Sequence, residues 1–118
     1  MTRAFKMLTF QAASLATAGL MLSTVAAITR AAPAPAAASV EIANFTFKAP
    51  VTTVKIGTTV TWTNADDIPH TVTSNRGLFK SKVLDSGDKF SFTFAKAGQF
   101  GYFCSLHPHM TGMIVVKA

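Results

Sequence analysis

The chain has 118 residues, of which 49% are hydrophobic and 14% are charged, and its formal net charge is +6. It contains a single cysteine, which excludes an internal disulfide. From residue 40 onward there are eight basic and five acidic residues, a net charge of +3. This modest excess excludes the dense basic stripe that is typical of a nucleic-acid-binding protein.

The N-terminal stretch has the pattern of a targeting segment. Arg3 and Lys6 precede an uncharged, mostly apolar stretch over residues 7–28, and small residues follow it. This order is typical of a secretory signal peptide. We therefore expect residues 1–32 to be an export signal, with its cleavage point left open. The alternative is an uncleaved membrane anchor, because the apolar stretch is close to the ~20 residues that span a bilayer.

A short segment rich in alanine and proline, residues 33–39, predicts a linker. The folded domain is then expected over residues 40–118. A domain of this size buries little apolar surface, so small domains commonly depend on a disulfide or a metal. Since one cysteine cannot form an internal disulfide, the sequence favours a bound metal.

Short runs of β-branched and aromatic residues, separated by turn residues, follow one another along the domain. No segment shows the 3.6-residue period of an amphipathic helix. About eight short strands with these spacings predict an all-β fold, an antiparallel Greek-key β-sandwich. The expected strands cover residues 40–47, 51–56, 58–63, 70–72, 79–84, 90–94, 99–103 and 113–116.

Alternation within these strands indicates which side chains are buried. Val60 and Trp62 point to one side of their strand and threonines to the other, which predicts a half-buried strand. Phe100, Tyr102 and Cys104 also share one face. The thiol is therefore expected to end a strand on its buried side.

The chemistry of the chain is concentrated near its end, in the spacing Cys104-x-x-His107-x-x-Met110. A thiolate, an imidazole and a thioether are ligands that suit copper. A fourth ligand has to come from elsewhere, and His70 lies in a polar loop 34 residues before Cys104. Two imidazoles, one thiolate and a weak methionine sulfur form the trigonal set of a blue-copper centre.

Three questions remain open from the residues alone. His107 and His109 are two residues apart, so in an extended segment they point the same way, and alternation does not choose between them. One cysteine and two histidines also suit tetrahedral zinc, although methionine is a poor zinc ligand. A buried cysteine can also be an inert core residue.

Three segments carry a resemblance to a known family: Val60 to Asn64, Pro69 to Val72, and Tyr102 to Gly112. Together they resemble the cupredoxins, and within that family the amicyanin group, over essentially all of residues 40–118. The resemblance implies a type 1 copper protein of the periplasm that shuttles one electron between redox proteins and is not an enzyme.

The resemblance also assigns roles by position. It implies that Asn64 ties together the two segments that bear the ligands. Pro69 and Leu106 adjoin ligands in the sequence and are expected to border the site, with the Leu106 amide a candidate hydrogen-bond donor to the thiolate. The implied ligands of a single copper ion are His70, Cys104, His107 and Met110.

The family pattern bears on the two competing histidines. Its axial methionine is followed by one residue, a glycine and the last strand, which matches Met110-Thr111-Gly112. His109 with Met113 instead reproduces the spacing of azurin, another cupredoxin. The resemblance favours His107 and leaves His109 at the surface. The chain departs from the amicyanin group in having Leu106 in place of proline and His109 in place of phenylalanine.

Other functions fit parts of this pattern. A copper oxidase or nitrite reductase domain needs a second copper, and only His109 is left to bind it. The main alternative is a copper carrier or storage protein with no role in electron transfer. For an electron carrier we expect a monomer whose partners are redox proteins, such as a dehydrogenase or oxidase donor and a c-type cytochrome acceptor.

Overall fold

A computed structural model of the chain describes residues 36–118 together with residues 19, 23, 24, 26 and 27. The expected signal peptide over residues 1–32 therefore lies almost wholly outside the described residues. In the described part of the chain, no helix is long and apolar enough to cross a membrane.

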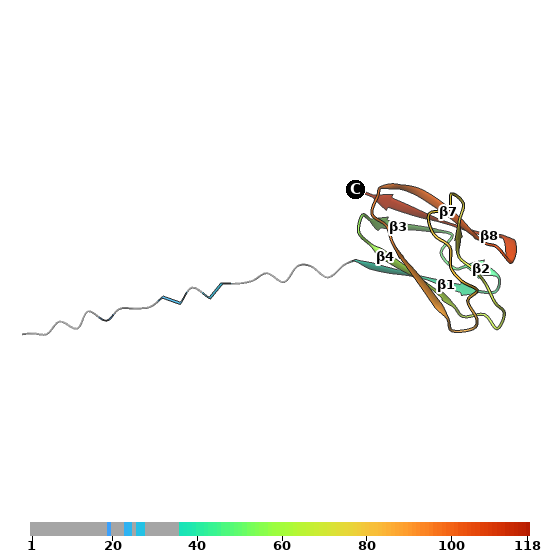
Figure 1. The fold of residues 1–118 in the computed structure, drawn as a ribbon, viewed down its shortest axis with the longest axis horizontal. Coiled ribbons are helices and arrows are strands. Elements are labelled where there is room, and N and C mark those ends of the chain that lie inside the picture. Colours follow the sequence, from blue (N-terminus) through green and yellow to red (C-terminus); the bar gives the residue numbers. More distant parts are fainter. Residues whose placement is uncertain (1–18, 20–22, 25, 28–35) are drawn as a thin grey trace, which may run out of the picture. The chain divides into compact units, whose positions relative to one another are not determined.

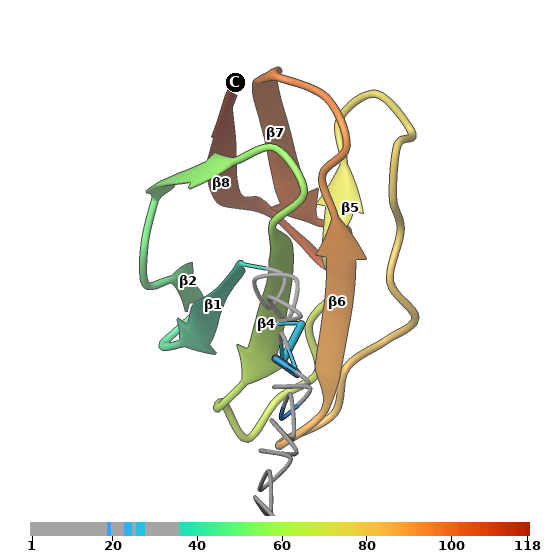
Figure 2. The ribbon, with the colours of Figure 1, turned by 90° about the vertical axis from the view of Figure 1, so that its left-hand side faces the viewer.

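The described residues form a sandwich of two four-stranded sheets, seen from two sides in Figures 1 and 2. One sheet has the order β2-β1-β4-β6 and the other β3-β8-β7-β5. The all-β sandwich predicted from the sequence is confirmed. The strands are β1 (Ala37–Ala43), β2 (Thr46–Phe47), β3 (Val51–Lys55), β4 (Thr59–Asn64), β5 (Thr73–Ser74), β6 (Lys89–Thr93), β7 (Gly98–Cys104) and β8 (His107–Lys117).

The expectation of a wholly antiparallel sandwich is wrong, because each sheet is mixed. β1 runs parallel to β4, and β3 runs parallel to β8. Strand direction depends on which strands become neighbours, and short alternating runs carry no signal for that. β1 also begins at Ala37, inside the stretch expected to be linker, because Ala37 to Ser39 pair with Thr59 to Thr61.

The single strand expected over residues 40–47 is also wrong. The chain reverses at Asn44 and Phe45, and Ala43 pairs with Thr46 in an antiparallel hairpin. Both turn residues have positive φ, 52° and 55°. A two-residue hairpin turn of this kind usually carries glycine, and because glycine is absent at both positions the turn could not be predicted from the sequence.

Two other expected strands are replaced by single bridges. His70 pairs with Leu84, and Thr73 pairs with Lys80, each as an isolated antiparallel bridge. No strand forms over residues 79–84, and the strand expected at 70–72 is displaced to β5. Both backbone hydrogen bonds of the first bridge are present: His70 N–H donates to Leu84 O at 3.0 Å, and Leu84 N–H donates to His70 O at 2.7 Å.

The core lies between the sheets and includes the large side chains Trp62, Tyr102, Phe47 and Phe94, all fully buried. The alternation expected for β4 is confirmed, since Trp62 and its strand neighbours two residues away are buried. Gly112 lies opposite Tyr102 in the β7–β8 register, and a side chain at Gly112 would collide with the tyrosine ring. Tyr102 is thereby packed closely against β8, two residues before the cysteine.

The segment expected to be a loop between β7 and β8 belongs mostly to β8. Cys104 pairs with His107 across a turn at Ser105 and Leu106, while Phe103 pairs with Thr111. The register therefore shifts between Phe103 and Cys104. Extra residues on the β8 side bulge out at this end of the sandwich.

Candidate metal centre

Cys104 is the last residue of β7, and its side chain is fully buried. The alternation that placed it on the face of Tyr102 is confirmed, since both side chains are inaccessible. The backbone N–H of Thr71 donates to Cys104 Sγ at 3.3 Å. This hydrogen bond ties the cysteine sulfur to the segment that carries His70.

His70 is also fully buried. Its backbone is fixed by the bridge to Leu84, and its ring is fixed by Asp66, whose Oδ2 lies 2.7 Å from His70 Nε2. With Nε2 donating to this carboxylate, Nδ1 is left as the metal-binding nitrogen. Nδ1 lies 3.8 Å from Cys104 Sγ.

His107 opens β8, just after the turn that follows Cys104. Its side chain is partly exposed, unlike that of His70. Nδ1 of His107 lies 3.6 Å from Cys104 Sγ. The ring of His107 thus lies between the buried thiol and the surface.

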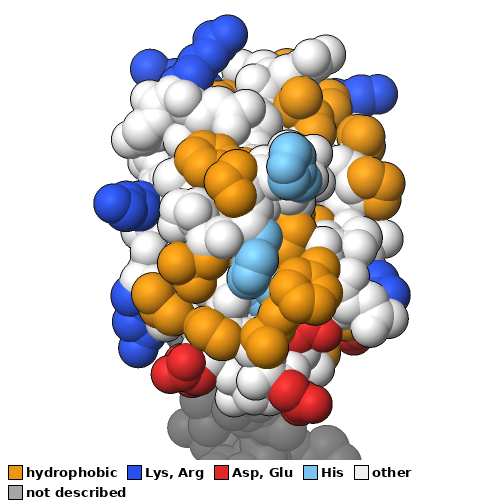
Figure 3. Space-filling view, turned by 90° about the vertical axis from the view of Figure 1, so that its right-hand side faces the viewer, with side chains coloured by type: hydrophobic (Ala, Val, Ile, Leu, Met, Phe, Trp, Pro, Cys, Tyr) orange, Lys and Arg blue, Asp and Glu red, His pale blue; other side chains and the backbone are white. Residues whose placement is uncertain are grey.

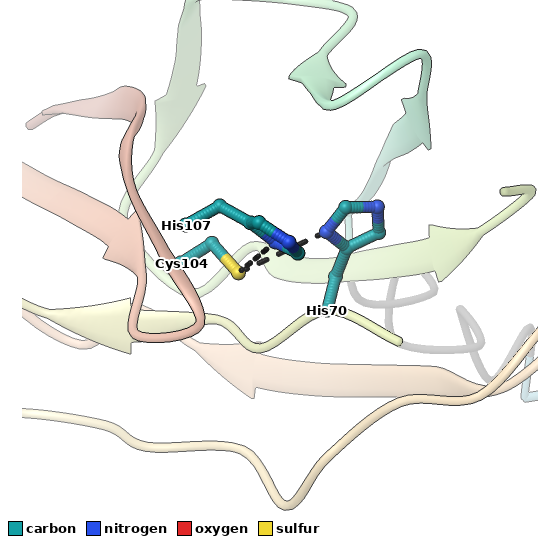
Figure 4. A group of neighbouring side chains, drawn as sticks. All are labelled: His70, Cys104 and His107. Carbon is teal, nitrogen blue, oxygen red and sulfur yellow. Dashed lines mark hydrogen bonds between the residues drawn. The ribbon is translucent and has the colours of Figure 1, made fainter. Parts of the chain in front are cut away.

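The three donor atoms converge on one point, as Figure 4 shows. The ligand atoms of His70, Cys104 and His107 all lie within 4.8 Å of one another. Metal bonds of about 2.0 Å to nitrogen and 2.3 Å to sulfur, meeting at a trigonal angle, separate those donors by about 3.7 Å. The observed sulfur–nitrogen distances of 3.6 and 3.8 Å are close to that separation.

The predicted fourth ligand, Met110, and the competing histidine, His109, differ in their surroundings. Met110 is 5% exposed and belongs to the core, and its role as the weak fourth ligand stays a prediction. His109 is exposed and lies outside the converging donor group of the described residues. The structure therefore brings His107 together with His70 and Cys104, and the assignment of these residues as ligands stays a prediction.

Asn64 does not make the connection expected of it. Its side chain is buried, and its Nδ2 donates to the carbonyl oxygens of Ile68 at 2.9 Å and Leu84 at 2.8 Å. Asn64 Oδ1 accepts the N–H of Asp66 at 2.9 Å. Because it ends β4 facing this loop, Asn64 shapes the chain before His70 and makes no hydrogen bond to the segment after Cys104.

That connection is made by Thr71 instead. Thr71 Oγ1 lies 2.7 Å from Ser105 Oγ and accepts the N–H of Ser105 at 2.7 Å. Sequence reasoning missed this pair, although each residue directly follows a predicted ligand. The expected role of Leu106 as a donor to sulfur is not seen, because among the described residues the hydrogen bonds to Cys104 Sγ from outside the two histidines come from Thr71. Pro69 is exposed, and its effect on the site stays a prediction.

Two further residues at the site were also missed. Asp66 precedes His70 by four residues, and a carboxylate near a ligand histidine is a signal that the sequence offers. Its pKa is held below the ordinary value, chiefly by the hydrogen bond from the backbone N–H of Phe45, with smaller contributions from His70 and Asn44. Phe45 packs against both histidines, and no sequence pattern pointed to it.

This arrangement can be compared with known proteins. Residues 12–116 match the Cupredoxin-like domain family. The chain belongs to the cupredoxin-like family. Among the relatives of this cupredoxin, amicyanin-alpha of Methylorubrum extorquens is 36% identical over 111 residues, which cover 90% of this chain and 92% of that protein. Amicyanin of Paracoccus versutus is 34% identical over 93 residues, 74% of this chain and 70% of that protein.

Solved structures agree with this assignment. An amicyanin variant in the Cu(I) form matches with a TM-score of 0.66 and 35% identity, over 69% of this chain and 82% of that one. A purple cupredoxin from Nitrosopumilus maritimus matches with a TM-score of 0.64 and 34% identity, over 68% of this chain and 99% of that one. Copper is the cofactor that the donor set and the family together indicate. The amicyanin and plastocyanin relatives imply a cupredoxin of the electron-transfer kind.

Proposed function

We propose that this cupredoxin binds one copper ion and carries one electron between redox proteins of the periplasm. The observation that supports this most strongly is the convergence of one thiol and two imidazole nitrogens at metal-binding separations. In this proposal Cys104 Sγ and the Nδ1 atoms of His70 and His107 are the strong ligands, and Met110 is the weak fourth.

Copper bound by this set would supply a one-electron couple between Cu(I) and Cu(II). The contribution of the protein is to hold the donors in place. Cys104 and His70 are fully buried, and each is restrained by a hydrogen bond, from Thr71 N–H and to Asp66 respectively. Donors that are fixed in this way rearrange little, which suits fast electron transfer.

The partly exposed ring of His107 is the place where a partner can come closest to the site. Exposed apolar side chains lie near it, among them Phe45, 54% exposed, and Leu106, 47% exposed. Figure 3 shows histidines on one face of the molecule surrounded by hydrophobic side chains, with lysine, arginine and acidic residues toward its margin. Met110 is buried and does not contribute to this surface. We propose this face as the docking surface for a dehydrogenase or oxidase donor and a c-type cytochrome acceptor.

Export to the periplasm belongs to the same proposal. Residues 1–32 would be removed as a signal peptide, and the domain beginning at β1 would follow a short linker. Fractionation of cells that express the full chain, with N-terminal sequencing of the product, tests this. Recovery of the uncleaved chain with the membranes would support the anchor instead.

A copper carrier or storage protein is the alternative function, and a redox experiment separates the two. The copper-loaded protein should be reduced and reoxidised reversibly by one electron while it retains the metal, and it should reduce a c-type cytochrome in a stopped-flow experiment. Loss of copper on each reduction, with no electron passed to a cytochrome, would support the carrier function.

A further inference from the structure

The ring of Phe45 packs edge-on against both histidines of the site. Its centroid lies 5.1 Å from that of His107, with an angle of 88° between the planes, and 5.7 Å from that of His70, with an angle of 86°. The two imidazoles are 5.0 Å apart. Phe45 is nevertheless 54% exposed, so the ring covers the histidines from the solvent side and is not part of the core.

The backbone at Phe45 adopts a conformation that a bulky residue rarely takes. Asn44 and Phe45 form the two-residue turn between β1 and β2, both with φ in the left-handed region. Glycine fits such a position better than phenylalanine does. A phenylalanine there persists only where its surroundings hold it in place.

Asp66 supplies that restraint. Its Oδ1 accepts the N–H of Asn44 at 2.7 Å, and its Oδ2 accepts the N–H of Phe45 at 3.0 Å. Oδ2 also lies 2.7 Å from His70 Nε2. One carboxylate therefore joins the β1–β2 turn to the buried histidine, in two segments that are 21 or more residues apart in the chain.

From these contacts we infer that Asp66 and Phe45 act together as positioning residues for the copper ligands. Asp66 stabilises the turn by accepting its two backbone N–H groups, and the turn places the Phe45 ring in contact with His70 and His107. The ring restrains His107, the more exposed of the two histidines, and screens the space between the imidazoles from water and chelators. This inference rests on the proposed copper function but adds a role that the ligand set alone does not require.

Three variants separate the ring from the fold. Phe45→Gly removes the ring and suits the positive φ, so the turn can still form. Asp66→Asn keeps the size of the side chain but places an amide N–H₂ among groups that are themselves donors. Leu78→Ala is the matched control, because Leu78 is 47% exposed and lies in the turn after β5, where its backbone N–H donates to Ser74 Oγ.

The first measurement is the rate at which a chromogenic chelator removes Cu(I) from the reduced holoprotein. Since two edge-to-face ring contacts are lost, Phe45→Gly should release copper about tenfold faster than the wild type. Asp66→Asn should also accelerate release, and Leu78→Ala should not. Release of copper from Phe45→Gly at the wild-type rate would overturn the inference.

The second measurement does not depend on copper. In the metal-free protein, NMR should show the His107 ring protons shifted by the nearby aromatic ring, and this shift should be lost in Phe45→Gly. It should be reduced in Asp66→Asn and unchanged in Leu78→Ala. An unchanged His107 signal in Asp66→Asn would overturn the assignment of Asp66. If the wild type failed to bind copper, the proposed function would fail, while this NMR comparison would still decide the packing role of Phe45.

Discussion

Thr71 and Ser105 join the two segments that carry the metal-binding residues, with their hydroxyl oxygens 2.7 Å apart. The N–H of Ser105 also donates to Thr71 Oγ1 at 2.7 Å. Because Thr71 follows His70 and Ser105 follows Cys104, this pair fixes the distance between the imidazole and the thiol. From the sequence we expected Asn64 to connect these two segments, and the hydrogen bonds between Thr71 and Ser105 do so instead.

Thr71→Val keeps the shape of the side chain and removes the hydroxyl. We expect the free energy of unfolding of the metal-free protein to fall by about 1–2 kcal/mol, because the Ser105 N–H loses its partner and Thr71 is almost fully buried. Chemical denaturation followed by tryptophan fluorescence measures this. Thr71→Ser, which keeps the hydroxyl, should lose less. Equal stability of Thr71→Val and the wild type would show that the pair does not hold the two segments together.

The lowered pKa of Asp66 predicts that the stability of the protein depends on pH. Its pKa in the folded protein is below the ordinary value of 3.8, chiefly because the Phe45 N–H donates to it. A group with a lowered pKa contributes stability that is complete above its ordinary pKa and is lost as the pH falls through the folded-state pKa. The stability difference between the metal-free wild type and Asp66→Asn should therefore be largest near neutral pH and shrink below pH 3.8.

The neighbouring Asp67 offers a matched control for this experiment, because it is exposed and accepts no hydrogen bond among the described residues. Asp67→Asn should follow the wild-type stability curve across the same pH range. A difference between the wild type and Asp66→Asn that stays constant down to the acid limit would contradict a lowered pKa at Asp66.

The close approach of Gly112 to Tyr102 predicts that a larger residue at position 112 disturbs the packing. Gly112→Ala places a methyl group against the buried Tyr102 ring, and overpacking of this kind should cost about 1–3 kcal/mol of stability. Gly101→Ala is the comparison, because its methyl group would meet the end of the Asn75 side chain, which can move aside. Thermal unfolding of both metal-free variants tests this, and equal losses would contradict the close packing of Tyr102 on β8.

Much of this site could be predicted from the sequence, for identifiable reasons. Cys104 and His107 are three residues apart, so a single local segment places both, and alternation along β7 showed that the thiol faces inward. His70 was identified because it supplies the second imidazole that a blue-copper centre needs beside Cys104, His107 and Met110. What alternation could not supply was strand direction, which depends on the contacts between distant strands, as for β1 and β4.

The residues missed at the site all act on segments that are distant from them in the sequence. Phe45 reaches the histidines only because a turn with positive φ reverses the chain, and neither of its residues is a glycine that would have signalled it. Thr71 and Asp66 act through hydrogen bonds to segments up to 34 residues away, and spacing within one segment does not reveal such pairs. The three converging donor residues could therefore be predicted from the sequence. The residues that position them could be identified only in the three-dimensional structure.

Addition of Cu(II) to the purified protein shows whether Cys104, His70 and His107 hold one copper ion. The wild type should develop the intense visible absorption of a copper–thiolate bond at one equivalent of metal. His109→Ala should do the same, while Cys104→Ser should stay colourless and His107→Ala should lose the wild-type spectrum. A wild type that stays colourless, or a protein bleached by His109→Ala but not by His107→Ala, would contradict this account.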